Sequence, residues 1–240
     1  MLKLRDLHIK YPDGTEPISG ISLSLADGES VALIGENGAG KTTLLLSLVG
    51  VLPLSCGSVT VGDIQLTTKN LDAVRERIGM VFQNPDDQLF MPVIMDDVMF
   101  GPHNFGRSKE EIDRLASETL KLLGIAHLKE RSTLKLSGGE KRLAAISTVL
   151  VMEPCVMLLD EPTAFLDPKA RRNLINVLSR LPHTKLIATH DLTFAHEVCE
   201  RVVIMKGGRI AADGTPRELL FDEELMERCG LEAIGKGLGK

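Results

Sequence analysis

The sequence has very few aromatic residues, with no tryptophan, a single tyrosine and only 3% aromatics among 240 positions. The apolar fraction is nevertheless 43% and the charged fraction 25%, both close to the averages of globular proteins. A hydrophobic core must therefore be built mainly from aliphatic side chains. A chain of this length can bury a sizeable core, so disorder is excluded as a description of the whole chain.

The sequence also lacks a long hydrophobic run. Its longest apolar stretch, Leu44 to Leu54, covers 11 positions and is interrupted by Ser47, Gly50 and Pro53, whereas a membrane-spanning helix needs roughly 20 apolar residues. The first residues mix charged and apolar side chains and contain no continuous apolar segment of the kind found in signal peptides. We therefore expect no membrane-spanning segment and a chain that stays in the cytoplasm.

The sequence also lacks an excess of basic residues and clustered cysteines, which argues against two classes of function. Lys and Arg number 28 against 33 Asp and Glu, so the formal net charge is −5 and the basic excess typical of nucleic-acid binders is missing. The four cysteines, Cys56, Cys155, Cys199 and Cys229, show no CxxC spacing, which argues against a zinc site or a disulfide framework. Cys155 lies in a run that predicts a buried strand.

Apolar periodicity predicts an α/β fold. Leu2 to Ile9 and Ile18 to Leu25 alternate with period two, which indicates a small antiparallel sheet. Ser30 to Ile34 predicts a buried strand, and Lys41 to Val49 predicts a helix. Two later apolar runs are each followed by a polar cluster and a helical pattern, which predicts parallel strands at Val156 to Leu159 and at Lys185 to Ala188.

Helical periodicity dominates the middle of the chain, from Asp97 to Val151. This region includes the amphipathic segment Ser108 to Leu123, for which Ser108 is the predicted N-cap. We therefore expect a helical lobe between the strands. Further on, two short apolar runs joined by Gly207-Gly208 predict a hairpin.

The segment Gly35 to Thr42 has the pattern G-x-x-x-x-G-K-T and lies between a predicted strand and a predicted helix, where phosphate-binding loops are found. Its glycines allow successive backbone N–H groups and the helix N-terminus to point at an anion. Lys41 adds a positive charge for the β and γ phosphates, and the Thr42 hydroxyl suits magnesium. The alternative interpretation is a glycine-rich turn that only caps a helix.

Two adjacent carboxylates, Asp160 and Glu161, follow the predicted strand at Val156 to Leu159, at the edge where ligands bind in such sheets. Asp160 can hold magnesium, and Glu161 can polarise or orient an attacking water. His190 follows another predicted strand and should reach the same edge. Taken alone, the acidic pair is more often a turn and the histidine more often structural, but the phosphate loop favours the catalytic interpretation of the pair.

A second glycine-containing loop, Leu136 to Glu140, precedes the helical pattern Lys141 to Leu150. It therefore predicts another helix N-terminus suited to an anion. A single nucleotide cannot use both loops unless another subunit supplies the second one.

Taken in order, these motifs resemble those of the ATP-binding cassette (ABC) ATPases, from about Tyr11 to Asp213. The resemblance implies an α/β fold: a P-loop NTPase (RecA-like) core with a mostly parallel sheet, a small N-terminal antiparallel β subdomain and an inserted α-helical lobe at about 84–150. It further implies a single nucleotide-binding domain over residues 1–230. The glycine-rich end of the chain predicts a flexible tail at 231–240.

The resemblance also implies roles for individual residues, with ATP and Mg²⁺ as cofactors. Glu161, His190 and Gln83, the glutamine of the Q-loop, are the expected catalytic residues. Thr42, Gln83 and Asp160 are the expected magnesium ligands. The expected nucleotide-binding residues are Tyr11, which would stack on adenine, and Gly35, Glu36, Asn37, Gly38, Ala39, Gly40, Lys41, Thr42, Thr43, Ser137, Gly138, Gly139 and Glu140.

In this family the signature loop, here Leu136 to Glu140, closes over ATP bound to the other subunit. The resemblance therefore implies a head-to-tail dimer with a second ABC ATPase subunit, either an identical chain or a close paralogue. The sequence departs from the usual pattern at two positions. Bulky Phe165 stands in the D-loop before Leu166-Asp167, which disfavours tight packing across the dimer, and Glu140 replaces the commoner glutamine. Neither change removes a catalytic group.

A narrower resemblance, to the ATPases of energy-coupling factor importers, rests on Val81 to Phe90 together with Asp96-Asp97-Val98 and Phe100-Gly101-Pro102. It implies a peripheral location on the cytoplasmic face of the membrane, with a transmembrane coupling subunit and a membrane substrate-binding subunit as partners. An exposed Leu89-Phe90-Met91 edge beside Asp86 and Asp87 would suit a helix with basic and apolar residues; ordinary lobe packing is the alternative. Cobalt or nickel ions are the expected substrate, ahead of biotin or another vitamin.

Two rival functions keep the same chemistry. A soluble ABC ATPase of DNA repair would usually carry a long insertion between Q-loop and signature, but Gln83 and Ser137 are only 54 positions apart. This spacing and the acidic charge argue against nucleic acid as a partner. A cassette of an exporter or an amino-acid importer would have a different partner, and the segment Asn84 to Phe90 argues against it.

Overall fold

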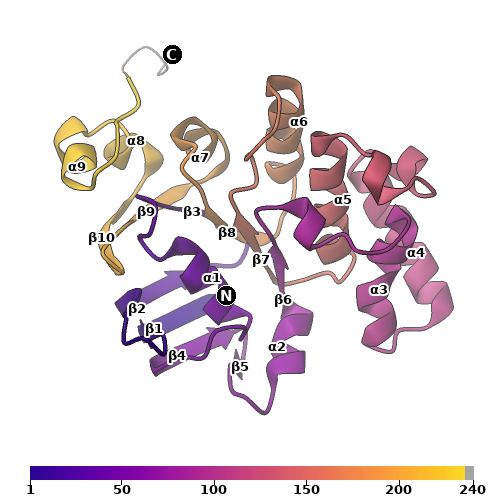
Figure 1. Ribbon diagram of the computed structural model, residues 1–240, viewed down its shortest axis with the longest axis horizontal. Coiled ribbons are helices and arrows are strands. Elements are labelled where there is room, and N and C mark those ends of the chain that lie inside the picture. The colour runs from indigo at the N-terminus through magenta and orange to yellow at the C-terminus, as the bar shows by residue number, and fades with distance from the viewer. Residues whose placement is uncertain (236–240) are drawn as a thin grey trace.

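The structure is a computed structural model that describes residues 1–235, in which the strands form two sheets (Figure 1). The smaller sheet is antiparallel, with the order β2-β1-β4-β5. The larger has the order β10-β9-β3-β8-β7-β6 and is parallel except for the β9–β10 pair. The strands are β1 (Leu2–Ile9), β2 (Ile18–Leu25), β3 (Ser30–Gly35), β4 (Cys56–Val61), β5 (Ile64–Gln65), β6 (Ile78–Val81), β7 (Val156–Asp160), β8 (Thr184–Ala188), β9 (Arg201–Lys206) and β10 (Arg209–Gly214).

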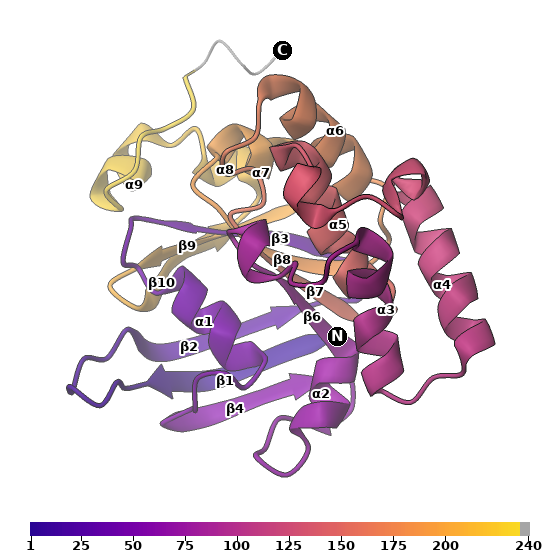
Figure 2. The ribbon, with the colours of Figure 1, turned by 45° about the vertical axis from the view of Figure 1, so that its right-hand side comes forward.

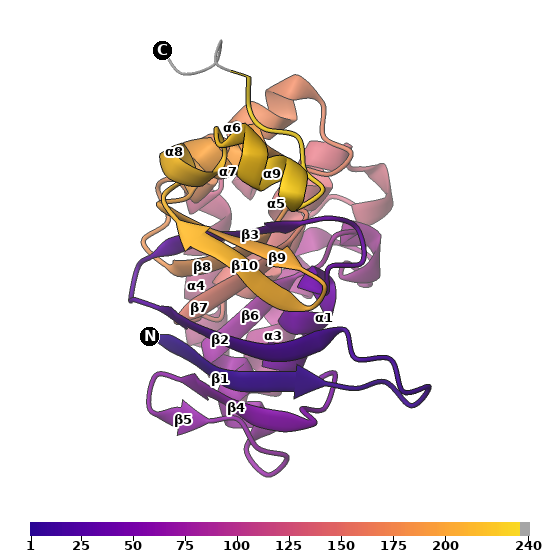
Figure 3. The ribbon, with the colours of Figure 1, turned by 90° about the vertical axis from the view of Figure 1, so that its left-hand side faces the viewer.

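Helices cover both faces of the larger sheet. Helix α1 lies between the two sheets, and α5 to α9 lie on the opposite face (Figures 2 and 3). Helices α3 and α4 pack beside α5 at one end of the molecule and form the lobe (Figure 2). The helices are α1 (Lys41–Leu48), α2 (Leu71–Arg77), α3 (Ile94–Asn104), α4 (Lys109–Leu122), α5 (Gly138–Leu150), α6 (Pro168–Leu178), α7 (Leu192–Val198), α8 (Pro216–Leu219) and α9 (Glu223–Arg228), with short 3-10 turns at η1 (Pro85–Asp87), η2 (Ala126–Leu128) and η3 (Thr133–Lys135).

The parallel strands β3, β7 and β8 are buried at every position and mostly apolar, because both faces of the sheet are covered. Successive residues of a strand point to opposite faces, so each strand contributes to two cores. In β3, Val31 and Leu33 pack with α1 and the antiparallel sheet, whereas Ala32 and Ile34 pack with the outer helices. This division explains why the predicted strands are continuous apolar runs rather than alternating ones.

The predicted α/β architecture is confirmed. The first two strands occupy the predicted residues, and the predicted helix α4 begins after its N-cap Ser108, whose side chain accepts a hydrogen bond from Glu111 N–H. Strands β4 and β6 were not predicted. Strand β6 contains Gly79, where an added Cβ would lie 2.2 Å from a methyl carbon of Val149, so the close approach of α5 requires glycine in the strand.

The structure corrects one expectation: Cys155 is exposed, because the buried strand β7 begins only at the next residue. Within the tail predicted at 231–240, the chain packs as far as Ile234, which is buried and donates its N–H to Leu220 O over 2.8 Å. The rest of that predicted tail, 236–240, lies outside the described residues. Among residues 1–235, no helix is both long and apolar enough to cross a membrane.

We predict that Phe194→Ala lowers the free energy of unfolding by about 3–5 kcal/mol, because the ring is fully buried beneath α7 and its removal leaves a cavity. Phe165→Ala is the matched control: that ring is 88% exposed, so the change should stay within about 0.5 kcal/mol. Urea denaturation of both variants measures the difference. Equal losses would contradict the packing described above.

Candidate active site

The loop between β3 and α1 packs closely against neighbouring backbone segments. Gly40 has a φ of 99°, and an added Cβ would lie 2.5 Å from Pro17 O. An added Cβ at Gly35 would lie 2.5 Å from Met205 O. Both positions therefore require glycine, Gly40 for its left-handed backbone and both for the close approach of another backbone segment.

Lys41, the first residue of α1, is the buried cation of this loop. Its Nζ donates hydrogen bonds to Gly35 O at 2.7 Å and to Glu36 O at 3.1 Å, which fixes the ammonium group inside the loop. Burial lowers the pKa of Lys41, while the nearby carboxylates of Glu161 and Asp160 oppose that shift. A phosphate group that enters the loop would meet a cation already desolvated and held in place.

Asp160 ends β7 and lies opposite Ala188 of β8 in the parallel register. Its Oδ2 accepts a 2.8 Å hydrogen bond from Thr42 Oγ1, whereas Oδ1 is buried and has no hydrogen-bond partner among the described residues. Burial raises the pKa of Asp160, and the Thr42 hydrogen bond opposes this effect. A carboxylate oxygen without a partner beside a hydroxyl is a donor set that fits Mg²⁺.

Glu161 adopts a φ of 43°, a left-handed conformation that is rare for a residue other than glycine. Its Oε2 accepts hydrogen bonds from His190 N–H at 3.2 Å and from Thr189 Oγ1 at 3.3 Å, and lies 2.8 Å from His190 Nδ1. The carboxylate is thus held by the loop that follows β8, although His190 itself is largely exposed.

A cavity of about 540 Å³ brings most of the predicted site residues together. Within it, the hydroxyl of Tyr11 lies 2.9 Å from Thr43 Oγ1. Gly35 and Glu36 contribute carbonyl groups to the loop, and Ala39 packs into the core beneath it. The predicted residues that line the cavity are Tyr11, Asn37, Gly38, Gly40, Lys41, Thr42, Thr43, Gln83, Asp160, Glu161 and His190.

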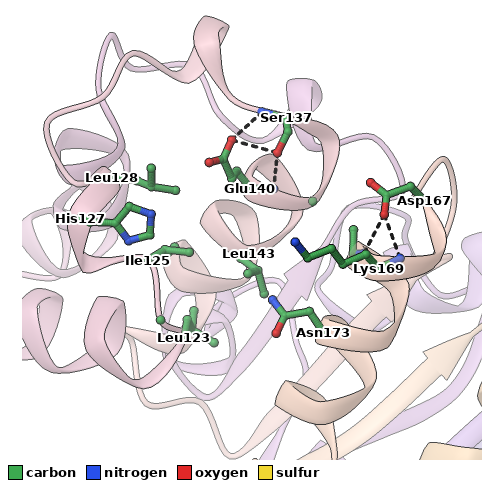
Figure 4. Close-up of a pocket in the computed structure, with 13 residues that line it drawn as sticks. Leu123, Ile125, His127, Leu128, Ser137, Glu140, Leu143, Asp167, Lys169 and Asn173 are labelled. Carbon is green, nitrogen blue, oxygen red and sulfur yellow. Dashed lines mark hydrogen bonds between the residues drawn. The ribbon is translucent and has the colours of Figure 1, made fainter.

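The predicted residues Ser137, Gly138, Gly139 and Glu140 do not line this cavity. They form the start of α5, where Ser137, Gly139 and Glu140 line a separate pocket of about 570 Å³ next to the start of α6 (Figure 4), and Gly138 lines a smaller pocket beside Phe165. Ser137 is the N-cap, and Glu140 Oε2 accepts hydrogen bonds from Ser137 N–H at 2.8 Å and from Ser137 Oγ at 2.9 Å. Glutamate in place of the commoner glutamine therefore keeps the capping box intact. Across the pocket, Asp167 caps α6.

Two side chains that were not predicted from the sequence hold the Q-loop. Arg142 of α5 is fully buried and donates hydrogen bonds to Phe82 O at 2.7 Å and to Gln83 O at 2.6 Å. Gln88 accepts from Phe82 N–H and donates to Ala145 O, also in α5. Burial lowers the pKa of Arg142 to about 10, with Asp160 opposing the shift. A signal was available: Arg142 occupies the apolar face of the predicted helix, where a charge must have a buried partner.

The segment after the Q-loop differs from the predicted edge. Leu89 is buried and Met91 is half-buried, so Phe90 is the exposed member of the three, at 63%. Its ring makes an edge-to-face contact with the exposed Phe100, with centroids 4.9 Å apart. Asp97 lies beneath them, and its Oδ1 accepts hydrogen bonds from Phe90 N–H and Met91 N–H, both at 3.1 Å.

The family model described as ABC transporter matches residues 18–164. The chain belongs to the ABC transporter family. It is therefore an ABC ATPase that binds ATP. A Geobacter sulfurreducens protein provisionally named as an ABC transporter ATP-binding protein is 49% identical, over 97% of this chain and 93% of its own length. The energy-coupling factor transporter ATP-binding protein EcfA of Methanothermobacter thermautotrophicus is 42% identical, over 96% of this chain and 76% of its own length.

Solved structures agree with this assignment. The cbiO1 structure from Clostridium perfringens, part of the ABC transporter complex cbiONQ, has a TM-score of 0.84 and 39% identity, covering 95% of this chain and 93% of that one. The ATP-binding cassette MJ0796, solved as a dimer in a post-hydrolysis state with ADP and Pi, has a TM-score of 0.81 and 27% identity, covering 90% and 99%.

For this ABC ATPase we predict that Lys41→Ala weakens ATP binding about 10- to 100-fold. The phosphates would lose a charge-assisted hydrogen bond, an interaction worth about 1.5–3 kcal/mol. Titration with a fluorescent ATP analogue measures the affinity. Lys69→Ala, at an exposed position far from the loop in sequence, is the control and should bind normally. Unchanged affinity in Lys41→Ala would overturn the phosphate-loop assignment.

Proposed function

We propose that this chain is the ATPase subunit of an importer of the energy-coupling factor type, located peripherally on the cytoplasmic face of the membrane. Cobalt or nickel ions are the proposed substrate, with biotin or another vitamin as the alternative. The similarity to EcfA, and to cbiO1 from the cbiONQ complex, supports the importer type. The choice of metal ions rests on that resemblance, because the substrate would contact the membrane subunits and not this chain.

The exposed aromatic pair beside the Q-loop is the observation that carries this proposal. Phe90 and Phe100 lie on the surface, and the exposed Asp86 and Asp87 come a few residues before Phe90 in the chain, with Asp86 also paired to Lys141. Asp97 accepts a hydrogen bond from the backbone N–H of Phe90 and so orders this backbone. A partner that binds the Phe90 ring therefore loses little conformational entropy of the segment. A helix that carries both apolar and basic side chains complements such a surface. We assign that helix to the transmembrane coupling subunit.

In the cavity, each residue has a proposed role in ATP hydrolysis. Lys41 binds the β and γ phosphates, Thr42, Asp160 and Gln83 hold Mg²⁺, and Tyr11 stacks on adenine. Mg²⁺ would neutralise phosphate charge when bound. Glu161 acts as the general base for the attacking water, with its carboxylate held by the His190 loop.

The site is completed by a second ABC ATPase subunit, identical or closely related. Ser137 to Glu140 lie outside the cavity of their own chain, so they can contact a nucleotide only on another subunit. The dimeric structure of MJ0796 supports this arrangement. The N-terminus of α5 then points at the phosphates with its backbone N–H groups and positive dipole end.

We predict that Glu161→Gln preserves ATP affinity but slows hydrolysis by about 100-fold or more, because the general base is lost while the amide keeps its shape. ATP trapped in this variant should hold the dimer together, which light scattering detects. His190→Ala should also reduce turnover with binding intact. The exposed Glu110→Gln variant serves as the control. Normal hydrolysis by Glu161→Gln would reject its assignment as the base.

The importer assignment is tested by affinity purification of the tagged chain from detergent-solubilised membranes, followed by mass spectrometry. We predict that a multi-span membrane protein and a small substrate-binding membrane protein are recovered, the second of which identifies the substrate. Phe90→Ala should lower this recovery about tenfold with ATPase activity of the isolated chain unchanged. Leu122→Ala, equally exposed at 63% but on α4, is the matched control. Recovery of no membrane protein would reject the importer.

A further inference from the structure

A partly buried ion pair joins α6 to the loop that carries His190. Arg171 donates two hydrogen bonds to Asp191, from Nε to Oδ2 at 2.7 Å and from Nη2 to Oδ1 at 2.9 Å. Both side chains are less than a quarter exposed. Bidentate pairs of this kind are the strongest and most directional of protein ion pairs, because two parallel bonds fix the relative orientation of both groups.

Asp191 directly follows His190, and both its backbone N–H and its carboxylate form hydrogen bonds. Its N–H donates to Thr189 Oγ1 at 3.0 Å, and its Oδ1 accepts from Phe194 N–H at 2.8 Å, which makes it the N-cap of α7. Burial opposes the ionisation of Asp191, yet the Arg171 guanidinium and the Phe194 N–H lower the pKa of this carboxyl. The charged pair therefore persists at neutral pH, and the backbone on either side of His190 has little freedom.

The same two segments are connected a second time at the catalytic carboxylate. Glu161 lies at the start of the segment that leads through the D-loop into α6, and its Oε2 contacts both His190 and Thr189. The Glu161 contact thus lies before the D-loop, and the Arg171 contact lies after it. Both contacts end within the three residues Thr189 to Asp191. A shift of α6 would move Asp191, and through it His190, relative to Glu161.

The neighbouring residue Arg172 forms an ion pair that does not involve the His190 loop. Its partner is Glu197 of α7, and its side chain is more than half exposed. Arg171 contacts Glu197 as well, at 3.7 Å. Both arginines therefore join α6 to α7, and only Arg171 reaches the residue after His190.

We propose that Arg171 is a positioning residue: through Asp191 it holds His190 against Glu161, and so makes ATP hydrolysis depend on the placement of α6 and the D-loop. The proposal rests on the proposed roles of Glu161 and His190. It requires no contact between Arg171 and the nucleotide, so Arg171 should affect turnover and leave ATP binding unchanged.

The experiment measures kcat, KM and ATP affinity of the full chain for Arg171→Ala, Arg171→Lys, Asp191→Asn and the control Arg172→Ala, with melting temperatures alongside. We expect Arg171→Ala to lower kcat about 10- to 30-fold, with ATP affinity and KM within about twofold. Arg171→Lys keeps the charge without the bidentate geometry and should recover part of kcat. Asp191→Asn keeps an oxygen for the Phe194 N–H, so α7 stays capped. Arg172→Ala should stay within about twofold in every parameter.

Combination variants separate positioning from general destabilisation. If Arg171 acts through Asp191 and His190, adding Arg171→Ala to Asp191→Asn or to His190→Ala should lower kcat no further. Multiplying losses, or a normal kcat in Arg171→Ala, would overturn the proposal. The same holds if Arg172→Ala reduces kcat as much as Arg171→Ala. Normal turnover of His190→Ala would instead reject the proposed role of His190 itself, so the two failures are distinguishable.

Discussion

The parallel hydrogen-bonded register of β3, β8, β7 and β6 is the constraint on which the whole site depends. It pairs Leu33 with Ala188, Asp160 with Ala188 and Val81 with Leu159, so four loops leave the sheet at the same edge. Those loops carry Lys41, His190, Glu161 and Gln83. A slip of one residue in any pairing would turn that strand's side chains to the opposite face. The two cores, which need alternate residues of each strand, prevent such a slip.

The site contains several buried charged groups, and their desolvation lowers the stability of the fold. Lys41, Asp160, Glu161 and Arg142 are all less than a tenth exposed, and each had to give up hydration. Backbone carbonyls, a threonine hydroxyl and the His190 loop compensate most of this cost, but Asp160 Oδ1 is left without a partner within residues 1–235. The backbone strain at Glu161 adds to the cost. These costly buried polar groups are therefore placed to interact with a charged ligand when it binds.

Two sets of contacts connect this edge to the rest of the molecule. On one side, Arg142 and Gln88 bond the backbone around Phe82 and Gln83 to α5, so the Q-loop moves with the signature helix. On the other side, Arg171 connects α6 to Asp191. The proposed contacts with the membrane partner, at Phe90, and with the nucleotide of the second ATPase subunit, at Ser137 to Glu140, both lie close in sequence to the first of these regions. Each contact is a directional, partly buried hydrogen bond, and can therefore transmit a small displacement without loss of packing.

The sequence by itself determined the α/β architecture, the position of the glycine-rich loop between β3 and α1, and most of the residues that line the cavity, because apolar periodicity and the glycine spacing are local properties of the chain. It did not determine β4 or β6, where glycine and exposed residues break the pattern, or the burial of Leu89. Only the tertiary structure decided that Ser137 to Glu140 face away from their own cavity, and that Arg142, Gln88 and Arg171 hold the catalytic loops. These contacts join residues 20 to 60 positions apart, and which side chains meet depends on how the helices pack across the sheet rather than on any local pattern.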